Sequence, residues 1–163
     1  MIVFDASTLI LLARIGLLRE VVKNAEVVIS DVVQMEATRK GTPDAGLIDQ
    51  LVREKMLRVE RVPAKKEVKR LMADFPIQNG EASSVVLASE KGAILATDDK
   101  ATIKVCKVFR IGFATALHFL VHFRERGFLS REIALAKLDK LQEYGRYHAD
   151  IIRDATERIK GGD

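Results

Sequence analysis

Short apolar runs alternate with amphipathic stretches along most of the chain. Residues 1–4, 26–29 and 93–97 are short runs rich in Val, Ile and Leu, as expected of buried strands. Between them, apolar residues recur every three to four positions, which is typical of helices. Strands that alternate with helices predict a parallel sheet covered on both faces, which is an α/β fold.

Turn and cap residues place the element limits. Thr42 and Pro43 predict a helix start, and Gly92 is expected to end the helix at residues 81–91. Residues 57–62 alternate apolar and charged side chains, which predicts an edge strand or an extended linker, and residues 108–112 are expected to form the last strand. The other expected helices are residues 6–12, 17–23, 31–40, 43–55, 64–75, 100–107, 114–126, 130–143 and 146–160.

Length and composition favour one ordered domain. The chain has 163 residues, of which 48% are hydrophobic and 31% charged, and it contains no repeat or low-complexity linker. We expect a single domain over residues 1–163, with a sheet-and-site core at 1–112 and a helical C-terminal region at 113–163.

Charge and composition narrow the class of partner. The net charge of +4 permits a polyanionic partner, whereas the absence of Trp and the few aromatics disfavour a base-stacking platform. The single cysteine, Cys106, cannot form an intrachain disulfide and fits a reducing compartment. The longest uncharged apolar stretch, residues 6–13, is shorter than the roughly 20 residues that a membrane span needs. We therefore expect a cytoplasmic protein without a membrane anchor.

Five carboxylates follow the predicted strands. Asp5 follows the first strand, Glu36 lies in the helix after the second, Glu81 opens a later helix, and Asp98 and Asp99 follow the strand at 93–97. In open α/β sheets ligands bind at the carboxyl ends of the strands, so these acids are expected to meet there. Gathered carboxylates repel one another, and a hard cation such as Mg²⁺ or Mn²⁺ relieves that repulsion. The pattern indicates metal-assisted phosphoester chemistry.

Each acid taken alone also has a structural explanation. Asp5 can cap the first helix, Asp98 or Asp99 can cap another, and Glu81 can interact with a helix dipole. Glu36 can be a solvated surface residue. The joint placement of acids after buried strands favours a site over these separate explanations.

The ordered motifs resemble the PIN domain, particularly the prokaryotic VapC-type toxins. The matching segments are residues 2–10 (IVFDASTLI), 32–36 (VVQME), 79–83 (NGEAS) and 94–100 (ILATDDK). They cover about the first two-thirds of the chain in the order of the family. The resemblance implies a three-layer α/β/α sandwich with a mostly parallel sheet, to which this chain adds C-terminal helices.

The resemblance also implies an activity and a site. It implies an endoribonuclease that depends on Mg²⁺ or Mn²⁺, with RNA as substrate and, in a toxin, an antitoxin protein as partner. Asp5, Glu36, Glu81 and Asp99 would be catalytic, and these four together with Asp98 would bind metal. Many relatives keep only the second acid of the late pair, which favours Asp99, and they often have Asp where Glu81 stands. The added C-terminal helices separate the chain from the shortest toxins.

Other side chains are candidates for substrate and partner contacts. Ser7 matches a small hydroxyl residue that orients Asp5 or a water. Lys100 and Lys104 lie on one expected helix face after the acid pair and are candidates to hold RNA phosphates, with a solvated face as the alternative. An apolar set on the helix at 43–55 is either an interface for a homodimer or an antitoxin, or ordinary core. This set is Leu47, Ile48, Leu51 and Val52.

Alternative chemistries have weaker support. His118 and His122 are spaced to share a metal, but the sequence lacks the Glu of an H-E-x-x-H motif. Cys106 has no identifiable His partner for thiol catalysis. A phosphatase of the haloacid dehalogenase kind, with Asp5 as nucleophile, normally needs a second Asp where Ser7 stands. A catalytically inactive PIN-like binding module is the non-enzyme alternative, which the complete set of acids disfavours.

Overall fold

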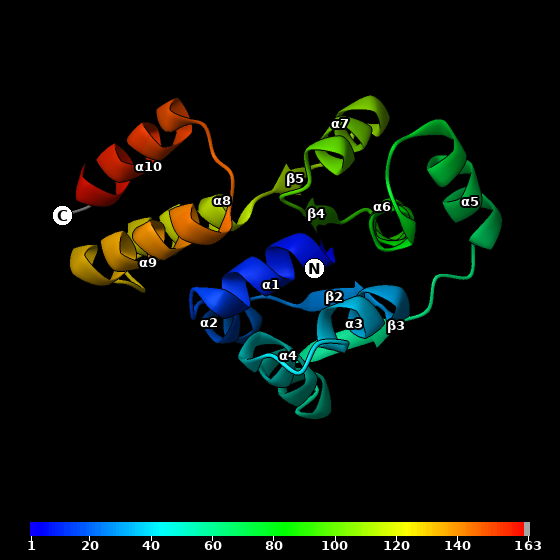
Figure 1. The fold of residues 1–163 in the computed structure, drawn as a ribbon, viewed down its shortest axis with the longest axis horizontal. Helices are drawn as coiled ribbons and strands as arrows, with labels where there is room; N and C mark the ends of the chain where they lie inside the picture. The colour runs from blue at the N-terminus through cyan, green and yellow to red at the C-terminus, as the bar shows by residue number, and fades with distance from the viewer. Residues whose placement is uncertain (162–163) are drawn as a thin grey trace.

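Five parallel strands form one sheet in the order β3-β2-β1-β4-β5 (Figure 1). The computed structural model describes residues 1–161; the last two residues of the expected domain, 162 and 163, lie outside the described residues. The strands are β1 Ile2–Phe4, β2 Val27–Ser30, β3 Leu57–Glu60, β4 Ile94–Ala96 and β5 Phe113–Ala114. The predicted parallel sheet and the edge position of β3 are confirmed.

Helices connect every pair of consecutive strands and continue after the last one. They are α1 Ala6–Arg14, α2 Leu18–Asn24, α3 Asp31–Thr38, α4 Pro43–Arg53, α5 Lys65–Asp74, α6 Asn79–Lys91, α7 Lys100–Phe109, α8 Ala116–Glu125, α9 Arg131–Tyr144 and α10 Ala149–Gly161. As expected, Thr42 caps α4 ahead of Pro43, and Gly92 ends α6 with a φ of 59°. None of the helices within residues 1–161 is long and apolar enough to cross a membrane.

Alternation along the strands divides the interior into two cores. Val3 and Leu95 point to the core beneath α5, α6 and α7, whereas Phe4 and Ala96 point to the core beneath α1, α2 and α8. Successive side chains of a strand point to opposite faces, so two apolar cores require helices on both sides of the sheet. The three-layer α/β/α arrangement is therefore confirmed.

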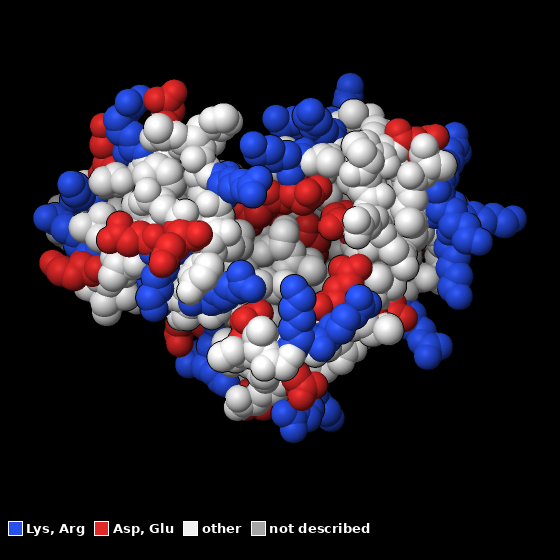
Figure 2. All heavy atoms as spheres, viewed as in Figure 1, with Lys and Arg blue, Asp and Glu red and all other residues white. Residues whose placement is uncertain are grey.

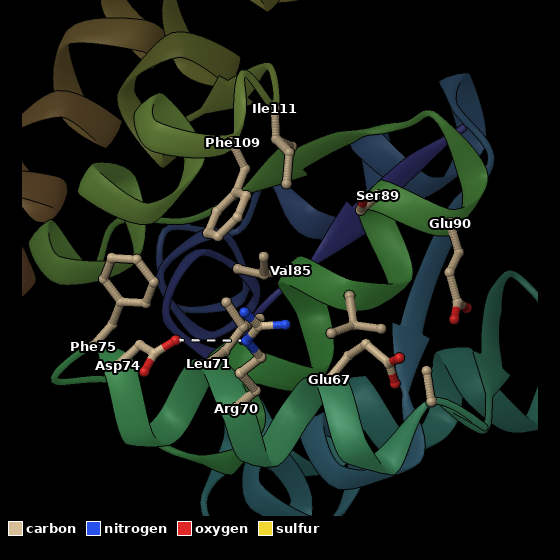
Figure 3. Close-up of a pocket in the computed structure, with 12 residues that line it drawn as sticks. Glu67, Arg70, Leu71, Asp74, Phe75, Val85, Ser89, Glu90, Phe109 and Ile111 are labelled. Atoms are coloured by element: carbon tan, nitrogen blue, oxygen red, sulfur yellow. Dashed lines mark ion pairs between the residues drawn. The ribbon is translucent and has the colours of Figure 1, made fainter.

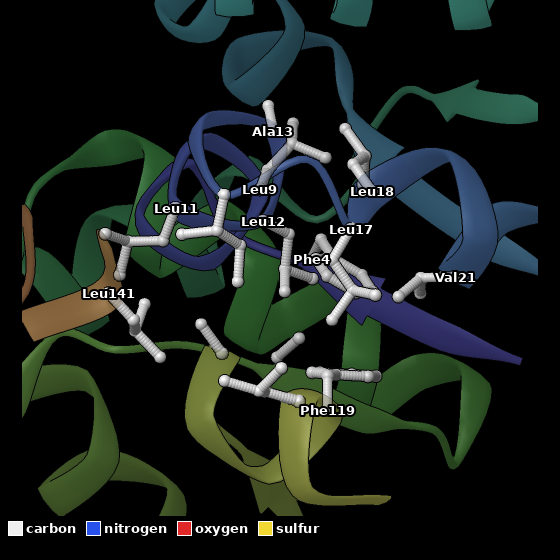
Figure 4. Packing of buried hydrophobic residues seen from close by; sticks show 14 of the residues in the cluster. Phe4, Leu9, Leu11, Leu12, Ala13, Leu17, Leu18, Val21, Phe119 and Leu141 are labelled. Carbon is white, nitrogen blue, oxygen red and sulfur yellow. The ribbon is translucent and has the colours of Figure 1, made fainter. Parts of the chain in front are cut away.

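The C-terminal helices pack on α1. The rings of Phe4 and Phe119 lie 5.3 Å apart, and Leu141 of α9 is fully buried in the same cluster (Figure 4). The ammonium group of Lys137 donates to the carbonyl oxygens of Ile15 and Gly16, at 2.7 and 3.2 Å, just after the end of α1. These contacts fix the helix that follows Asp5.

Two local predictions change in the structure. The expected last strand at residues 108–112 is wrong, because α7 continues to Phe109 and ends at Arg110, whose φ of 55° is left-handed. Strand β5 begins only after Gly112, where an added Cβ would lie 3.0 Å from Ile94. On α4, Ile48 and Leu51 are fully buried and Leu47 and Val52 pack against the same core, so this set is core rather than an interface.

Candidate functional site

The carboxyl edge of the sheet brings two of the predicted acids together. Strands β1 and β4 are neighbours, with Phe4 in register with Ala96, so Asp5 and residues 97–99 leave the sheet at the same edge. The Asp5 N–H donates to the Ala96 carbonyl at 3.0 Å, which extends this pairing beyond the strand. Burial is the main cause of the raised pKa of Asp5, and the nearby charge of Asp98 adds to it.

Asp5 is buried beneath this edge and is only 1% exposed. Its Oδ1 accepts the Ser7 hydroxyl at 2.6 Å and the Thr8 N–H at 3.2 Å, and its Oδ2 accepts the Thr97 hydroxyl. Burial raises the pKa of Asp5 to about 7, although these hydrogen bonds favour the charged form. The groups that favour the charge are hydroxyls and a backbone N–H rather than a Lys or Arg side chain. The carboxylate would therefore be stabilised by a cation.

Asp98 joins three separate parts of the fold. Its Oδ2 accepts the Thr8 hydroxyl at 2.6 Å and the Ala116 N–H of α8 at 2.9 Å. Its Oδ1 accepts the Tyr147 hydroxyl at 2.5 Å, and its own N–H donates to Ser7 at 2.9 Å. Both carboxylate oxygens thus have protein partners, which gives Asp98 an organising role that its position after β4 did not reveal.

Asp5 and Asp99, which were also explained as helix caps, do cap helices, and Glu81 lies at a helix start as its dipole explanation expects. Asp99 caps α7, because its Oδ2 accepts both the N–H and the hydroxyl of Thr102 at 2.8 Å. Glu81 accepts the Gln78 N–H at 2.9 Å at the start of α6, and Asp5 caps α1 through Thr8. A carboxylate has about four lone-pair sites, so a cap leaves capacity for another ligand.

Glu36 and Glu81 approach each other where α3 packs on α6. Burial raises the pKa of Glu36, and the charge of Glu81 raises it further. The Glu36 carboxylate lies against Gly80, where an added Cβ would be 2.2 Å from its Oε2. Gly80 therefore lets the Glu36 carboxylate approach the backbone of α6 next to Glu81.

A cleft of about 590 Å³ opens above these acids. Its lining residues are Ser7, Ile10, Leu11, Arg14, Glu81, Asp98, Asp99, Lys100, Tyr144, Gly145, Arg146 and Tyr147. On the face shown in Figure 2, acidic side chains gather in a central hollow with basic side chains around it. Asp5 lies below the cleft and is linked to it through Ser7, whereas Glu36 and Lys104 are not among the lining residues.

The donor set of the cleft fits a hard divalent cation. Its acidic side chains offer only carboxylate oxygens, which Mg²⁺ and Mn²⁺ prefer. Within residues 1–161, no three His, Cys, Asp or Glu side chains already form a common metal-binding group. Mg²⁺ commonly binds one or two carboxylates and keeps several waters, so a pair of these acids is enough for such an ion.

The remaining polar candidates are not among the residues that line the cleft. The His118 ring accepts the Thr115 N–H at 2.9 Å through its Nδ1 and so caps α8, and His122 is exposed one turn further along. Burial raises the pKa of Cys106 to about 11, which keeps its thiol protonated at neutral pH.

Sequence reasoning missed Thr8, Thr97, Tyr147 and the close approach at Gly80. The position of Thr97 between β4 and Asp98 was a usable signal for its contact with Asp5. Tyr147 is 49 residues from Asp98 in the chain, so no local pattern indicated their contact.

A second cavity, the apolar groove, shares no lining residue with the acidic cleft. It measures about 550 Å³ between α5, α6 and α7, and Leu71, Phe75, Val85, Phe109 and Ile111 form its apolar wall (Figure 3). The Arg70–Asp74 ion pair lies at its edge. This groove contains none of the predicted site acids.

Comparison with known proteins agrees with the fold. A family model described as a PIN domain matches residues 1–160. No curated protein and no solved structure gave a significant match. PIN domains are generally nucleases, and PIN nucleases typically use divalent metal ions. The match covers nearly the whole chain, including the parallel sheet and the C-terminal helices, and the chain belongs to the PIN-domain family.

Proposed function

We propose that this PIN-domain protein is an endoribonuclease that depends on Mg²⁺ or Mn²⁺. The observation that carries the proposal is the placement of Asp5, buried without a cationic partner beneath a cleft lined by Glu81, Asp98 and Asp99. Asp5 follows β1, Asp98 and Asp99 follow β4, and Glu81 lies in α6, so only the folded sheet brings these acids together. A structural role as separate helix caps does not require this convergence.

The five acids have two proposed roles, catalysis and metal binding. Asp5, Glu36, Glu81 and Asp99 are the proposed catalytic residues, and Asp98 joins them as a proposed metal-binding residue. A bound ion would activate a water and stabilise the oxygens of the phosphate undergoing displacement. Asp99 and Glu81 line the cleft with caps that occupy only part of their carboxylates, so either can accept a proton from a water there.

Ser7 and the lysines of α7 complete the proposed site. The Ser7 hydroxyl donates to Asp5 and accepts the Asp98 N–H, so it fixes these two acids relative to each other. Lys100 lines the cleft and is placed to hold a phosphate, whereas Lys104 lies one turn further on α7 and would contact a longer substrate.

The test compares Asp5→Asn with the exposed acid variant Asp74→Asn. We expect Asp5→Asn to lower Mn²⁺-dependent RNA cleavage by at least about 100-fold, which is the usual size for loss of a charge-stabilising group in a site. Asp74→Asn, on α5 and outside the cleft, should cleave like wild type. Cleavage by Asp5→Asn at the wild-type rate would overturn the proposal.

One observation favours an inactive binding module as the second candidate. Both oxygens of Asp98 already accept hydrogen bonds from the protein. Titration of the wild-type protein with Mn²⁺ by calorimetry separates the two candidates, because an inactive module without a metal site releases no binding heat. The phosphatase alternative is disfavoured, because Ser7 stands where such enzymes have a second Asp and donates its hydroxyl to Asp5.

The toxin role is a narrower proposal. A VapC-type toxin would be neutralised by an antitoxin protein encoded beside it. We expect a small open reading frame directly upstream, and we expect its product to suppress RNA cleavage by this protein. Toxicity on expression without suppression by that product would contradict the antitoxin part alone.

A further inference from the structure

Both tyrosines of the chain lie at the acidic cleft. The sequence has only two, and both line the cleft: Tyr144 is the last residue of α9, and Tyr147 lies in the turn between α9 and α10. The lining also includes Arg146 from this turn and Arg14 from the last turn of α1. One wall of the cleft therefore carries aromatic and guanidinium groups next to the acids.

The turn at residues 144–147 is fixed over the acids by specific contacts. The Tyr147 hydroxyl donates to Asp98 at 2.5 Å. An added Cβ at Gly145 would lie 2.6 Å from Cε2 of Tyr147, so only glycine allows this ring to fold back against the turn. The Gly145 N–H donates to the Leu141 carbonyl at 2.8 Å, which ties the turn to the end of α9. The position of this wall relative to the acids is thus set by the fold.

Arg14 and Tyr144 form an exposed stacked pair. The Arg14 guanidinium carbon lies 5.4 Å from the centroid of the Tyr144 ring, and its Nε lies 3.8 Å from Asp44. The Tyr144 residue is 49% exposed, and the Arg14 side chain is 40% exposed. Two turns of α1 separate Arg14 from Ser7, which is about 10 Å along the helix axis. Arg14 therefore lies about two helix turns along the cleft from Ser7, which binds Asp5.

We propose that Arg14 and Tyr144 form a base-binding wall that stacks on an unpaired nucleobase next to the phosphate held at the acids. The proposal rests on the proposed nuclease function and adds positioning residues to it. Unpaired bases stack on aromatic rings and on Arg planes, whereas bases inside a duplex are not available for this contact. Arg146, on the same turn, would hold a backbone phosphate and offset the negative charge of Asp98 and Asp99. The wall therefore requires an unpaired base beside the phosphate that the acids hold.

The test measures binding apart from cleavage. A fluorescently labelled, unstructured RNA oligonucleotide is titrated with Asp5→Asn protein in EDTA, and the dissociation constant is read by anisotropy. Adding Tyr144→Ala to this background should weaken binding about tenfold, and Tyr144→Phe should leave it unchanged because the ring remains. Arg14→Lys, which keeps the charge but loses the plane, should weaken binding by a smaller factor.

The matched control is Phe109→Ala, which removes an aromatic ring that is 51% exposed in the other cavity. It should not change RNA affinity. A hairpin RNA with no unpaired bases should bind less tightly than the unstructured strand and should not respond to Tyr144→Ala. If the Asp5→Asn protein binds the unstructured strand equally well with and without Tyr144→Ala, the proposed base-binding wall is wrong.

Failure of the wall and failure of the nuclease proposal give different results. RNA binding that depends on Tyr144, without Mn²⁺-dependent cleavage by the wild-type protein, would support the wall and reject the nuclease. Cleavage that depends on Asp5, with KM and RNA affinity unaffected by Tyr144→Ala, would support the nuclease and reject the wall.

Discussion

Two of the cavities within residues 1–161, the acidic cleft and the apolar groove, have nearly the same volume and opposite construction. The acidic cleft measures about 590 Å³ and the apolar groove about 550 Å³. The groove is built by α5, α6 and α7, which follow one another along the chain, and its wall is largely apolar (Figure 3). The cleft takes its side chains from α1, the start of α6, the segment from the end of β4 to the start of α7, and the end of α9 with the turn after it. Cavity size therefore does not identify the functional site.

The difference lies in how each wall is held. Hydrogen bonds between residues about 90 positions apart fix the cleft, as Thr8 bonds to Asp98 and Thr97 to Asp5. The groove is held by side-chain packing, such as the edge contact of Phe75 with Phe109 at 5.9 Å. A site that places charges needs directional contacts, whereas apolar packing suffices for a groove. The predictions below test this division.

The largest expected effect concerns the free energy of unfolding without metal. Because burial raises the pKa of Asp5 to about 7, the folded protein keeps a proton that the unfolded chain releases between about pH 4 and about pH 7. Stability should therefore fall as the pH rises through this range, by up to roughly 4 kcal/mol from Asp5. Urea unfolding in EDTA at several pH values measures it.

The control for this prediction is Asp5→Asn, which cannot release the proton and should lose most of this pH dependence. At neutral pH, Mn²⁺ should raise the free energy of unfolding of the wild-type protein but not that of Asp5→Asn, because only the native site binds the ion. Wild type and variant with parallel pH profiles would show that Asp5 is not the buried acid that sets the slope.

The second prediction removes the contact that joins the C-terminal turn to the acids. Tyr147→Phe leaves Oδ1 of Asp98 without its donor, and a hydrogen bond to a charged group contributes about 2 kcal/mol. Unfolding at neutral pH should show a loss of this size. Tyr144→Phe, which removes an exposed hydroxyl three residues away, should change stability by less than about 0.5 kcal/mol. Equal effects of the two variants would mean that Asp98 does not hold the turn.

The third prediction uses two glycines that both lie inside helices. Gly80→Ala would place a Cβ 2.2 Å from Oε2 of Glu36 and displace that carboxylate, whereas Gly46→Ala meets nothing within 4 Å. We expect Gly80→Ala to weaken Mn²⁺ binding roughly tenfold. Gly46→Ala should leave Mn²⁺ affinity unchanged and stabilise the protein by about 0.5–1 kcal/mol. Unchanged Mn²⁺ affinity in both variants, measured by calorimetry, would remove Glu36 from the site.

The sheet and the position of the candidate acids could be predicted from sequence patterns for definite physical reasons. Buried strands such as β2 are apolar on both faces, and acids that follow such strands must emerge at the carboxyl edge of a parallel sheet. The end of α7 was misplaced because Val108 and Phe109 are typical strand residues, yet they lie exposed on the last turn of the helix. Their position depends on how α7 packs, which local preference does not determine.

The contacts within the site depend on distances that no local pattern contains. Gly80 fits beside Glu36 only because α3 and α6 pack against each other, and Tyr147 meets Asp98 only because α8 and α9 pack on α1. The sequence contains only two tyrosines, and both line the same cleft. Composition reports how many residues of a kind exist, and the fold decides whether they meet.

The smallest expected effect is in the apolar groove. Phe109 is 51% exposed and contacts Phe75 edge to face, an interaction that contributes about 0.5–1.5 kcal/mol. Phe109→Ala should therefore lower the free energy of unfolding by about 1 kcal/mol or less. Mn²⁺ affinity and RNA cleavage should be unchanged, because the acids are fixed by hydrogen bonds from other elements. Cleavage is measured at a temperature where wild type and Phe109→Ala are both folded. If Phe109→Ala lowers cleavage as much as a substitution in the acidic site does, the two cavities are coupled. In that case α7, which carries Phe109 at one end and is capped by Asp99 at the other, is the element that would transmit the change.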